Sequence, residues 1–309
     1  MKKKYKVALA LGSLAIGATV INNAIFKMHN KRSISDCDQN FYRFKYGDIR
    51  YVVRGEGEPL LLIHDIFIGS SLKQWEDSIN YFSQHYKVYA IDLLGFGGSE
   101  KPAISYSSYL YISLINNFIT DVIKEKSYVV ASSGSAGFAV LASSLDSNNF
   151  KKLILISPVN GINFYSKFLC RLIESPVIGT TIYNIMSSRF YRKSFLENIV
   201  FFDSANASNS IVDSCNHTAH LGGASAKYPI ALLMSGYLDV NMSQHLEKIS
   251  VPTHIIWGAE NRLNSIENYD SIKHLNQSID MTVIDQAGLL PQSERPHEFF
   301  KACRDFLIL

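Results

Sequence analysis

The segment IDLLGFGGSEKP (residues 91–102) decides the fold class, because it joins an apolar run to a glycine-rich turn. Gly95, Gly97 and Gly98 can enter backbone conformations that other residues avoid, so the chain can turn tightly here. The apolar run before the turn, YKVYAID (86–92), contains β-branched residues and is typical of a strand that is buried on both faces. The segment therefore predicts a buried strand that ends in a tight turn.

Further strands are predicted on both sides of this segment. FYRFKYG and IRYVVRG are a candidate hairpin, and short apolar runs follow them, with helical stretches such as residues 106–125 and 297–307 between some of them. The predicted strands are 41–47, 49–55, 59–65, 86–92, 127–132, 151–158, 253–258 and 280–285. Strands that alternate with helices form βαβ units. We therefore expect an α/β fold with a mainly parallel central sheet and flanking helices.

A long interval separates the predicted strand that ends at Pro158 from the one that begins at Thr253. Its apolar residues recur at helical spacing, and it contains few strand signals. In a compact α/β domain, such an interval is expected to be an inserted helical layer rather than a loop. We place this inserted cap at about residues 160–248, within one domain that spans residues 36–309.

The glycine-rich segment resembles the D-x-x-G-x-G-x-S turn of the α/β-hydrolase superfamily. Three further segments resemble landmarks of that superfamily in the same order: PLLLIHD with GSSLKQW its oxyanion loop, VPTHIIWGAEN the strand that presents the acid, and DQAGLLPQSERPHEF the loop that presents the histidine. The resemblance covers about residues 41–309 and points to the cap-bearing esterases, epoxide hydrolases and lipases. It implies an α/β-hydrolase fold with a cap and a catalytic serine, acid and histidine.

The resemblance points to Ser133 as the catalytic serine. In VVASSGSAGF (129–138) a predicted strand runs into a helix between small residues, as the strained nucleophile turn of this superfamily requires. The pattern also fits Ser135, but the end of the strand favours Ser133. In the alternative interpretation these serines only cap the next helix.

The positions of the acid and the histidine hold other residue types. The acid motif G-x-x-D ends on Asn261, and the histidine of A-G-H-x-P falls on Leu289. A serine hydroxyl needs a neighbouring base to take its proton, and leucine cannot accept one. Asparagine can orient an imidazole but cannot stabilise its charged form, and in a serine protease this change lowers kcat by about 10⁴-fold.

Other side chains are candidates for the missing roles. Glu260 precedes Asn261 and could supply a carboxylate. His64 lies in the predicted oxyanion loop, while His217 and His220 lie in the predicted cap and could reach toward the serine. For each of these residues an ordinary structural role is the alternative.

The predicted oxyanion loop is altered as well. The His-Gly pair of the superfamily is His64-Asp65 in this chain. The backbone N–H groups of Ile66 and Gly134 could still form an oxyanion hole, but an ionised Asp65 would oppose the negative charge that develops there. Asp65 could instead be a displaced catalytic acid or a ligand anchor, or a loop carboxylate that caps a helix or faces solvent.

Residues 7–26 carry no charge, and a helix of about twenty residues spans the hydrocarbon core of a membrane. We therefore predict that residues 1–35 are a single membrane anchor and a polar linker. Because Asn22 and Asn23 interrupt the apolar run, the shorter run also fits a signal peptide that is cleaved from a secreted protein. A segment packed against the rest of the protein is the third possibility.

Charge and cysteine spacing exclude several classes of partner. The net charge is +3, and much of the positive charge lies in the first 32 residues, so no basic block remains to follow nucleic-acid phosphates. The four cysteines are far apart, and no histidines accompany them at metal-ligand spacing. We expect no nucleic-acid partner, no metal and no cofactor.

Two functions fit these residues. The first is a membrane-anchored serine hydrolase with atypical or weak catalysis, which cleaves an ester or amide of a hydrophobic small molecule or lipid-like ligand. The second is a catalytically inactive binding or scaffold protein that keeps the fold and the pocket. In that case Phe67, Trp75 and Tyr237 are candidates for the pocket lining.

Overall fold

A computed structural model describes most of the chain. The described residues are 2–30, 39–159, 166–236, 238, 240–265, 267, 272, 274 and 276–307, without the side chains of residues 2–12 and 29–30. The predicted domain boundary at residue 35, the predicted start of the cap at residue 160 and Tyr237 lie outside the described residues.

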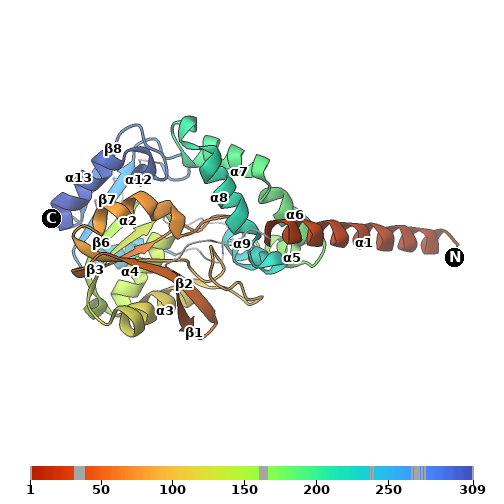
Figure 1. Ribbon diagram of the computed structural model, residues 1–309, viewed down its shortest axis with the longest axis horizontal. Coiled ribbons are helices and arrows are strands. Elements are labelled where there is room, and N and C mark those ends of the chain that lie inside the picture. Colours follow the sequence, from red (N-terminus) through yellow and green to blue (C-terminus); the bar gives the residue numbers. More distant parts are fainter. Residues whose placement is uncertain are drawn as a thin grey trace.

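An eight-stranded sheet forms the centre of the molecule, with the strand order β1-β2-β4-β3-β5-β6-β7-β8 (Figure 1). Strand β2 pairs antiparallel with β1 and with β4, and the other neighbours are parallel. The strands are β1 (Asn40–Phe44), β2 (Gly47–Arg54), β3 (Glu58–Ile63), β4 (Tyr86–Ile91), β5 (Ser127–Ser132), β6 (Phe150–Ile156), β7 (Thr253–Gly258) and β8 (Asp280–Ile284). The predicted strands and the mainly parallel sheet are confirmed.

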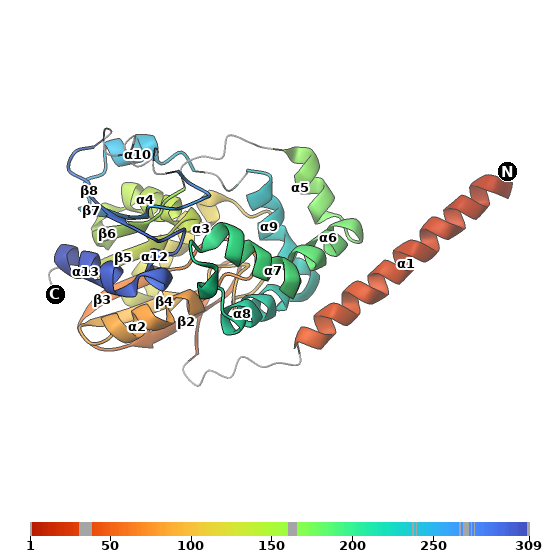
Figure 2. The same cartoon turned by 90° about the horizontal axis from the view of Figure 1, so that it is seen from above.

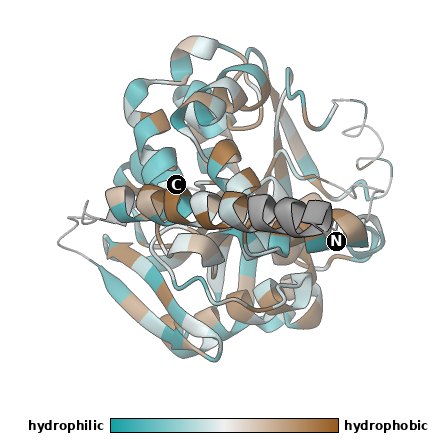
Figure 3. Cartoon of the chain, turned by 90° about the vertical axis from the view of Figure 1, so that its right-hand side faces the viewer, coloured by the Kyte–Doolittle hydropathy of each residue, from teal (hydrophilic) through white to brown (hydrophobic). Residues whose placement is uncertain are grey.

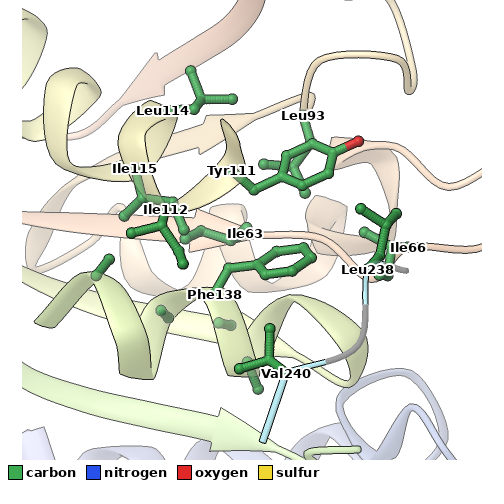
Figure 4. Packing of buried hydrophobic residues seen from close by; sticks show 14 of the residues in the cluster. Ile63, Ile66, Leu93, Tyr111, Ile112, Leu114, Ile115, Phe138, Leu238 and Val240 are labelled. Atoms are coloured by element: carbon green, nitrogen blue, oxygen red, sulfur yellow. The ribbon is translucent and has the colours of Figure 1, made fainter. Parts of the chain in front are cut away.

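Helices cover both faces of this sheet (Figure 2). On one face lie α2 (Glu76–Phe82) and α13 (Pro296–Leu307), and on the other lie α3 (Ser108–Phe118) and α4 (Gly134–Leu145). Side chains alternate between the faces of a strand, so neighbours such as Leu61 and Leu62 of β3 enter different hydrophobic clusters. In the α3–α4 layer the rings of Tyr111 and Phe138 stack with centroids 4.9 Å apart (Figure 4). The continuous apolar runs of the sequence are therefore strands that are buried on both sides.

The described part of the insertion between β6 and β7 is helical. We call α5 to α9 the cap helices, and a π-helical turn, η4 (Leu196–Val200), follows α7. The helices of the insertion are α5 (Lys167–Glu174), α6 (Ile178–Met186), α7 (Arg189–Phe195), α8 (Asn209–His220), α9 (Lys227–Met234) and α10 (Ser243–Glu247). The cap helices lie between the sheet and the first helix of the chain (Figure 1).

A buried ion pair holds the glycine-rich turn after β4. The Asp92 carboxylate is fully buried, and one of its oxygens lies 3.0 Å from Nη1 of Arg50. It also accepts hydrogen bonds from the backbone N–H groups of Leu72 and Gly98, both at 2.7 Å. Gly97 has φ +48°, and a Cβ atom there would collide with the Asp92 carboxylate. Glycine is therefore required for backbone conformation and for space.

The first helix, α1 (Lys2–Asn30), ends against the cap helices and projects away from the body (Figures 1 and 2). Asn22 is 5% exposed; its amide donates to Oγ1 of Thr181 at 3.1 Å and accepts from Nδ2 of Asn184 at 2.9 Å. One turn later Phe26, also 5% exposed, lies with its ring 5.9 Å from that of His220. These contacts fix the end of α1 to α6 and α8.

Earlier in α1, apolar side chains are exposed, among them Leu14, Ile16, Val20 and Ile21. Figure 3 shows hydrophobic residues along this helix in brown. Across the part of the chain that the structure describes, no helix combines the length and the apolar character needed to cross a membrane. The predicted membrane anchor over residues 7–26 is therefore not supported. The range is helical, but its last turns pack against the cap helices.

Asn22→Ala is expected to destabilise the protein by about 1–3 kcal/mol, because the buried amide of Asn184 loses its partner. Asn23, the adjacent and exposed residue of the same helix, provides the matched control, and Asn23→Ala should change stability by less than about 0.5 kcal/mol. Urea unfolding, with hydrogen exchange followed in α6, measures both effects. Equal stability of the two variants would contradict the docked arrangement of α1.

Candidate active site

Ser133 lies between the end of β5 and the start of α4, with φ +48° and ψ −112°. This conformation with positive φ is strained for a residue other than glycine, at a cost of order 1–3 kcal/mol. The Ser133 N–H donates to the Ile156 carbonyl of the neighbouring strand at 2.7 Å. Ser135 lies within the first turn of α4, and its hydroxyl donates to the Ser132 carbonyl at 2.8 Å. Ser133 therefore has the backbone geometry that the sharp strand-to-helix turn predicts.

The predicted oxyanion-hole groups converge on the side chain of Asp65. Its Oδ1 accepts the backbone N–H of Ile66 at 2.6 Å and that of Gly134 at 3.0 Å. Asp65 is 4% exposed, and its own N–H donates to Oε1 of Gln74 at 3.1 Å. An oxyanion hole works by aiming two such donors at the place where negative charge develops. Here the Asp65 carboxylate accepts hydrogen bonds from both N–H groups.

Burial raises the pKa of Asp65 to about 6, because the charged carboxylate loses its hydration. The N–H groups of Ile66 and Gly134 hydrogen-bond to the carboxylate, and together with the nearby Ser133 side chain they partly offset this rise. The ionisable group beside the Ser133 side chain is thus a carboxylate, where the superfamily would have an imidazole.

Leu289, at the position of the expected histidine, is 1% exposed and packs in an apolar cluster with Leu196 and Val200 of η4. Its N–H donates to the Val200 carbonyl at 2.8 Å. The adjacent Gly288 N–H donates to a carboxylate oxygen of Glu294 at 2.5 Å. The loop that would present a histidine therefore packs against the end of η4.

Asn261 and Glu260 hold local backbone. Oδ1 of Asn261 accepts the N–H groups of Leu263 and Asn264, at 3.0 and 3.2 Å, which is the pattern of a turn stabilised by its own side chain. A carboxylate oxygen of Glu260 accepts the Ala287 N–H at 2.9 Å, and the Glu260 N–H donates to the Ala287 carbonyl at 3.0 Å. Both side chains fasten the loops that follow β7 and β8.

The candidate replacement histidines are also engaged. His64 is fully buried, with Nδ1 2.5 Å from the Asp65 carbonyl and Nε2 accepting the Leu93 N–H at 3.0 Å. Because Leu93 is the donor, Nε2 carries no proton, and burial lowers the pKa of the ring. In α8, His220 contacts the Asn216 carbonyl at 2.7 Å and Oγ of Ser187 at 3.2 Å, and His217 is half-buried. The geometry does not support His64 or His220 as the base for Ser133.

Gln74 and Glu294 hold the site in place, although the family resemblance assigns neither of them a role. Gln74 accepts from Asp65, as described above. Oε1 of Glu294 accepts the Phe202 N–H at 2.8 Å while Oε2 accepts Gly288, so this carboxylate joins the segment after η4 to the Leu289 loop. Burial raises the pKa of Glu294. Its place in the short helix α12 (Pro291–Glu294), directly after the altered motif, is the signal that points to it.

The predicted oxyanion groups line a small cavity. This cavity of about 40 Å³ is lined by Ile66 and Gly134 and by apolar residues that include Leu238 and Val240. Figure 4 shows the side chains of Ile66, Leu238 and Val240. A separate cavity of about 260 Å³ includes Phe67 in its lining and shares no lining residue with the first. Trp75, a predicted lining residue, is fully buried in the core cluster of α2 and α13. In the described residues, no three His, Cys, Asp or Glu side chains are grouped as metal ligands.

The chain matches the model of the family described as "Alpha/beta hydrolase family" over residues 60–302. It is 24% identical over 268 residues to 2-hydroxy-6-oxo-6-(2'-aminophenyl)hexa-2,4-dienoic acid hydrolase of Metapseudomonas resinovorans, covering 84% of this chain and 87% of that protein. A shorter match, 47% identical over 53 residues, is to (E)-2-((N-methylformamido)methylene)succinate hydrolase of Acinetobacter baylyi, covering 17% of this chain and 19% of that protein.

Solved structures show the same fold. The CarC serine hydrolase of carbazole degradation superposes with a TM-score of 0.73 at 21% identity, covering 87% of this chain and 98% of that one. A bacterial membrane phospholipase A superposes with a TM-score of 0.71 at 19% identity, covering 99% and 98%. At these identities the likeness concerns the fold, and it confirms the predicted fold class.

Asp65→Asn is expected to change how stability depends on pH. Because the pKa of Asp65 is raised from 3.8 to about 6 in the folded protein, the folded state binds more protons than the unfolded state between these values. The free energy of unfolding contributed by Asp65 therefore falls as pH rises from about 4 to about 6, by roughly 3 kcal/mol at most. Urea unfolding of wild type and Asp65→Asn from pH 4 to 7 isolates this contribution, and parallel profiles would contradict it.

Proposed function

Because the chain belongs to the α/β hydrolase family, we propose that it keeps the family's architecture as a ligand-binding protein and does not use Ser133 for turnover. The ligand is a hydrophobic small molecule. One observation carries this proposal: Oδ1 of Asp65 accepts the N–H groups of both Ile66 and Gly134.

The rate of acyl transfer depends on the groups that this arrangement removes. Loss of one oxyanion-hole donor typically costs about 10² to 10³ in kcat. Here both donors are bonded to Asp65, and Leu289 cannot act as a base. To free the hole, the buried carboxylate would have to give up both N–H bonds. These costs support a binding role over rapid hydrolysis.

The charge of Asp65 also bears on the kind of ligand. The two hydrolases named above act, by their names, on a dienoic acid and on a substituted succinate, which are anions near neutral pH. An ionised Asp65 beside Ser133 opposes a second carboxylate there. We infer that the ligand of this chain does not bring a negative charge to Ser133.

A weak serine hydrolase is the second candidate, and a specific contact favours it. The Ser133 side chain lies beside the carboxylate of Asp65, whose pKa is raised to about 6. A carboxylate with a pKa near the working pH can act as a general base. The strained Ser133 backbone would then serve catalysis of an ester or amide of a hydrophobic small molecule.

Labelling by a fluorophosphonate probe separates the two candidates. Wild type is expected to stay unlabelled, at the level of Ser133→Ala. The variant Asp65→Gly, Asn261→Asp, Leu289→His restores the residue types of the family and should gain labelling that disappears when Ser133→Ala is added. Circular dichroism establishes that each variant is folded.

Strong labelling of wild type that is lost in Ser133→Ala would overturn the binding proposal in favour of the hydrolase. In that case Asp65→Asn should abolish the labelling, because the amide cannot take the serine proton while its shape is kept. Labelling that survives Asp65→Asn would exclude Asp65 as the base.

A further inference from the structure

The larger cavity lies between the loop after β3, the start of α2, α8 and the loop that carries Leu290. Its volume is about 260 Å³, against about 40 Å³ for the cavity lined by Ile66 and Gly134. The larger of these two cavities has room for a small organic molecule. Pockets for drug-sized ligands start at roughly 300 Å³, so the fitting ligand is smaller than those.

The inner wall of this cavity is apolar and rigidly packed. Leu196, Phe201 and Leu290 line it and are 1%, 2% and 4% exposed. They belong to the same apolar cluster as Leu289, the residue at the histidine position. Leu289 does not line the cavity, but it packs in one cluster with the residues that form its wall. Phe67, with its ring 5.7 Å from that of Phe195, completes this end.

The outer end is polar. Exposed Glu76 and Asp77, at the start of α2, line it together with exposed Lys73, which leaves a net negative charge. Hydroxyl groups of Ser210 and Ser214 on α8 add hydrogen-bonding capacity. A molecule seated here would have its apolar part inside and a polar head beside two carboxylates.

We propose that this cavity is the binding site of a small amphiphile that is not an anion. Its apolar body, about the size of one ring with a short chain, lies against Phe67, Leu196 and Phe201. Its hydroxyl or ammonium head lies at the mouth beside Glu76 and Asp77. The inference rests on the proposed binding role and gives it a location away from Ser133.

Three probes that share one body and differ in the head test the site on the full-length protein: 2-phenylethylamine, 2-phenylethanol and 3-phenylpropionate. Titration followed by NMR is expected to show saturable binding of the amine and the alcohol. The carboxylate should bind about three- to tenfold more weakly than the amine, since exposed charge pairs contribute modestly. In Glu76→Gln, Asp77→Asn this difference should shrink to less than about twofold.

Ile211, on α8, lines the mouth of the cavity. Ile211→Trp places a bulky indole ring there and should abolish binding of all three probes. Ser210→Trp, at an exposed position of the same mouth, is the second blocking variant should the first not fold. Ile178→Trp is the matched control, because Ile178 is exposed on α6 and does not line the cavity. It should leave the dissociation constants unchanged.

The site is overturned if wild type binds none of the probes, if the folded blocking variants bind them as wild type does, or if the carboxylate binds most tightly. These outcomes are independent of the fluorophosphonate result. Labelled wild type with binding that Ile211→Trp removes would refute the non-catalytic role of Ser133 and leave the cavity as a ligand site. Unlabelled wild type that binds no probe would refute this inference alone.

Discussion

The buried carboxylate of Asp92 is the constraint on which the arrangement of the site depends. It joins Arg50 of β2, the Leu72 N–H in the loop after β3 and the Gly98 N–H in the turn after β4. A buried charge is tolerated only when it is paired and its remaining lone pairs are hydrogen-bonded, and Asp92 meets both conditions. His64 adds a further tie, because its ring accepts the N–H of Leu93.

These hydrogen bonds fix the loop after β3, and residues of this loop line both cavities. At its start, Asp65 turns back onto the N–H groups of Ile66 and Gly134, so the predicted oxyanion hole already has an acceptor. Farther along, Phe67, Gly69 and Lys73 are among the residues that line the larger cavity. One anchored loop therefore supplies the acceptor for the predicted oxyanion hole and part of the lining beside α8, and the apolar cluster around Leu289 forms the opposite wall.

Much of the fold could be predicted from the sequence because its signals are local. Buried strands such as residues 86–92 show as continuous apolar runs, and glycines in 91–102 mark a turn whose geometry only glycine fits. The strained turn at Ser133 was predictable from the small residues around it. The residue types at positions 261 and 289 also predicted an altered catalytic centre.

The remaining features depend on partners that are distant in the sequence. In the sequence, Asn22 only interrupts an apolar helix. In the structure its amide forms hydrogen bonds with Thr181 and Asn184, which lie far along the chain. The Asp65 carboxylate is oriented by the N–H groups of Ile66 and Gly134, and no local pattern reveals the bond to the distant Gly134. From the sequence, His64 is a candidate base, because the residues around it do not reveal that its ring has two backbone partners. One of these partners, Leu93, lies in the turn after β4.

The pH dependence of two backbone amide protons, those of Ile66 and Gly134, tests the central claim most directly. Hydrogen bonds to an ionised carboxylate are shorter and stronger than those to its neutral form, so titration of the acceptor changes the chemical shift of the donor proton. If Oδ1 of Asp65 accepts both N–H groups, the two NMR signals move together with a common midpoint near pH 6, and Asp65→Asn removes that transition. Signals that stay constant from pH 4 to 8, or that titrate unchanged in Asp65→Asn, would contradict the account.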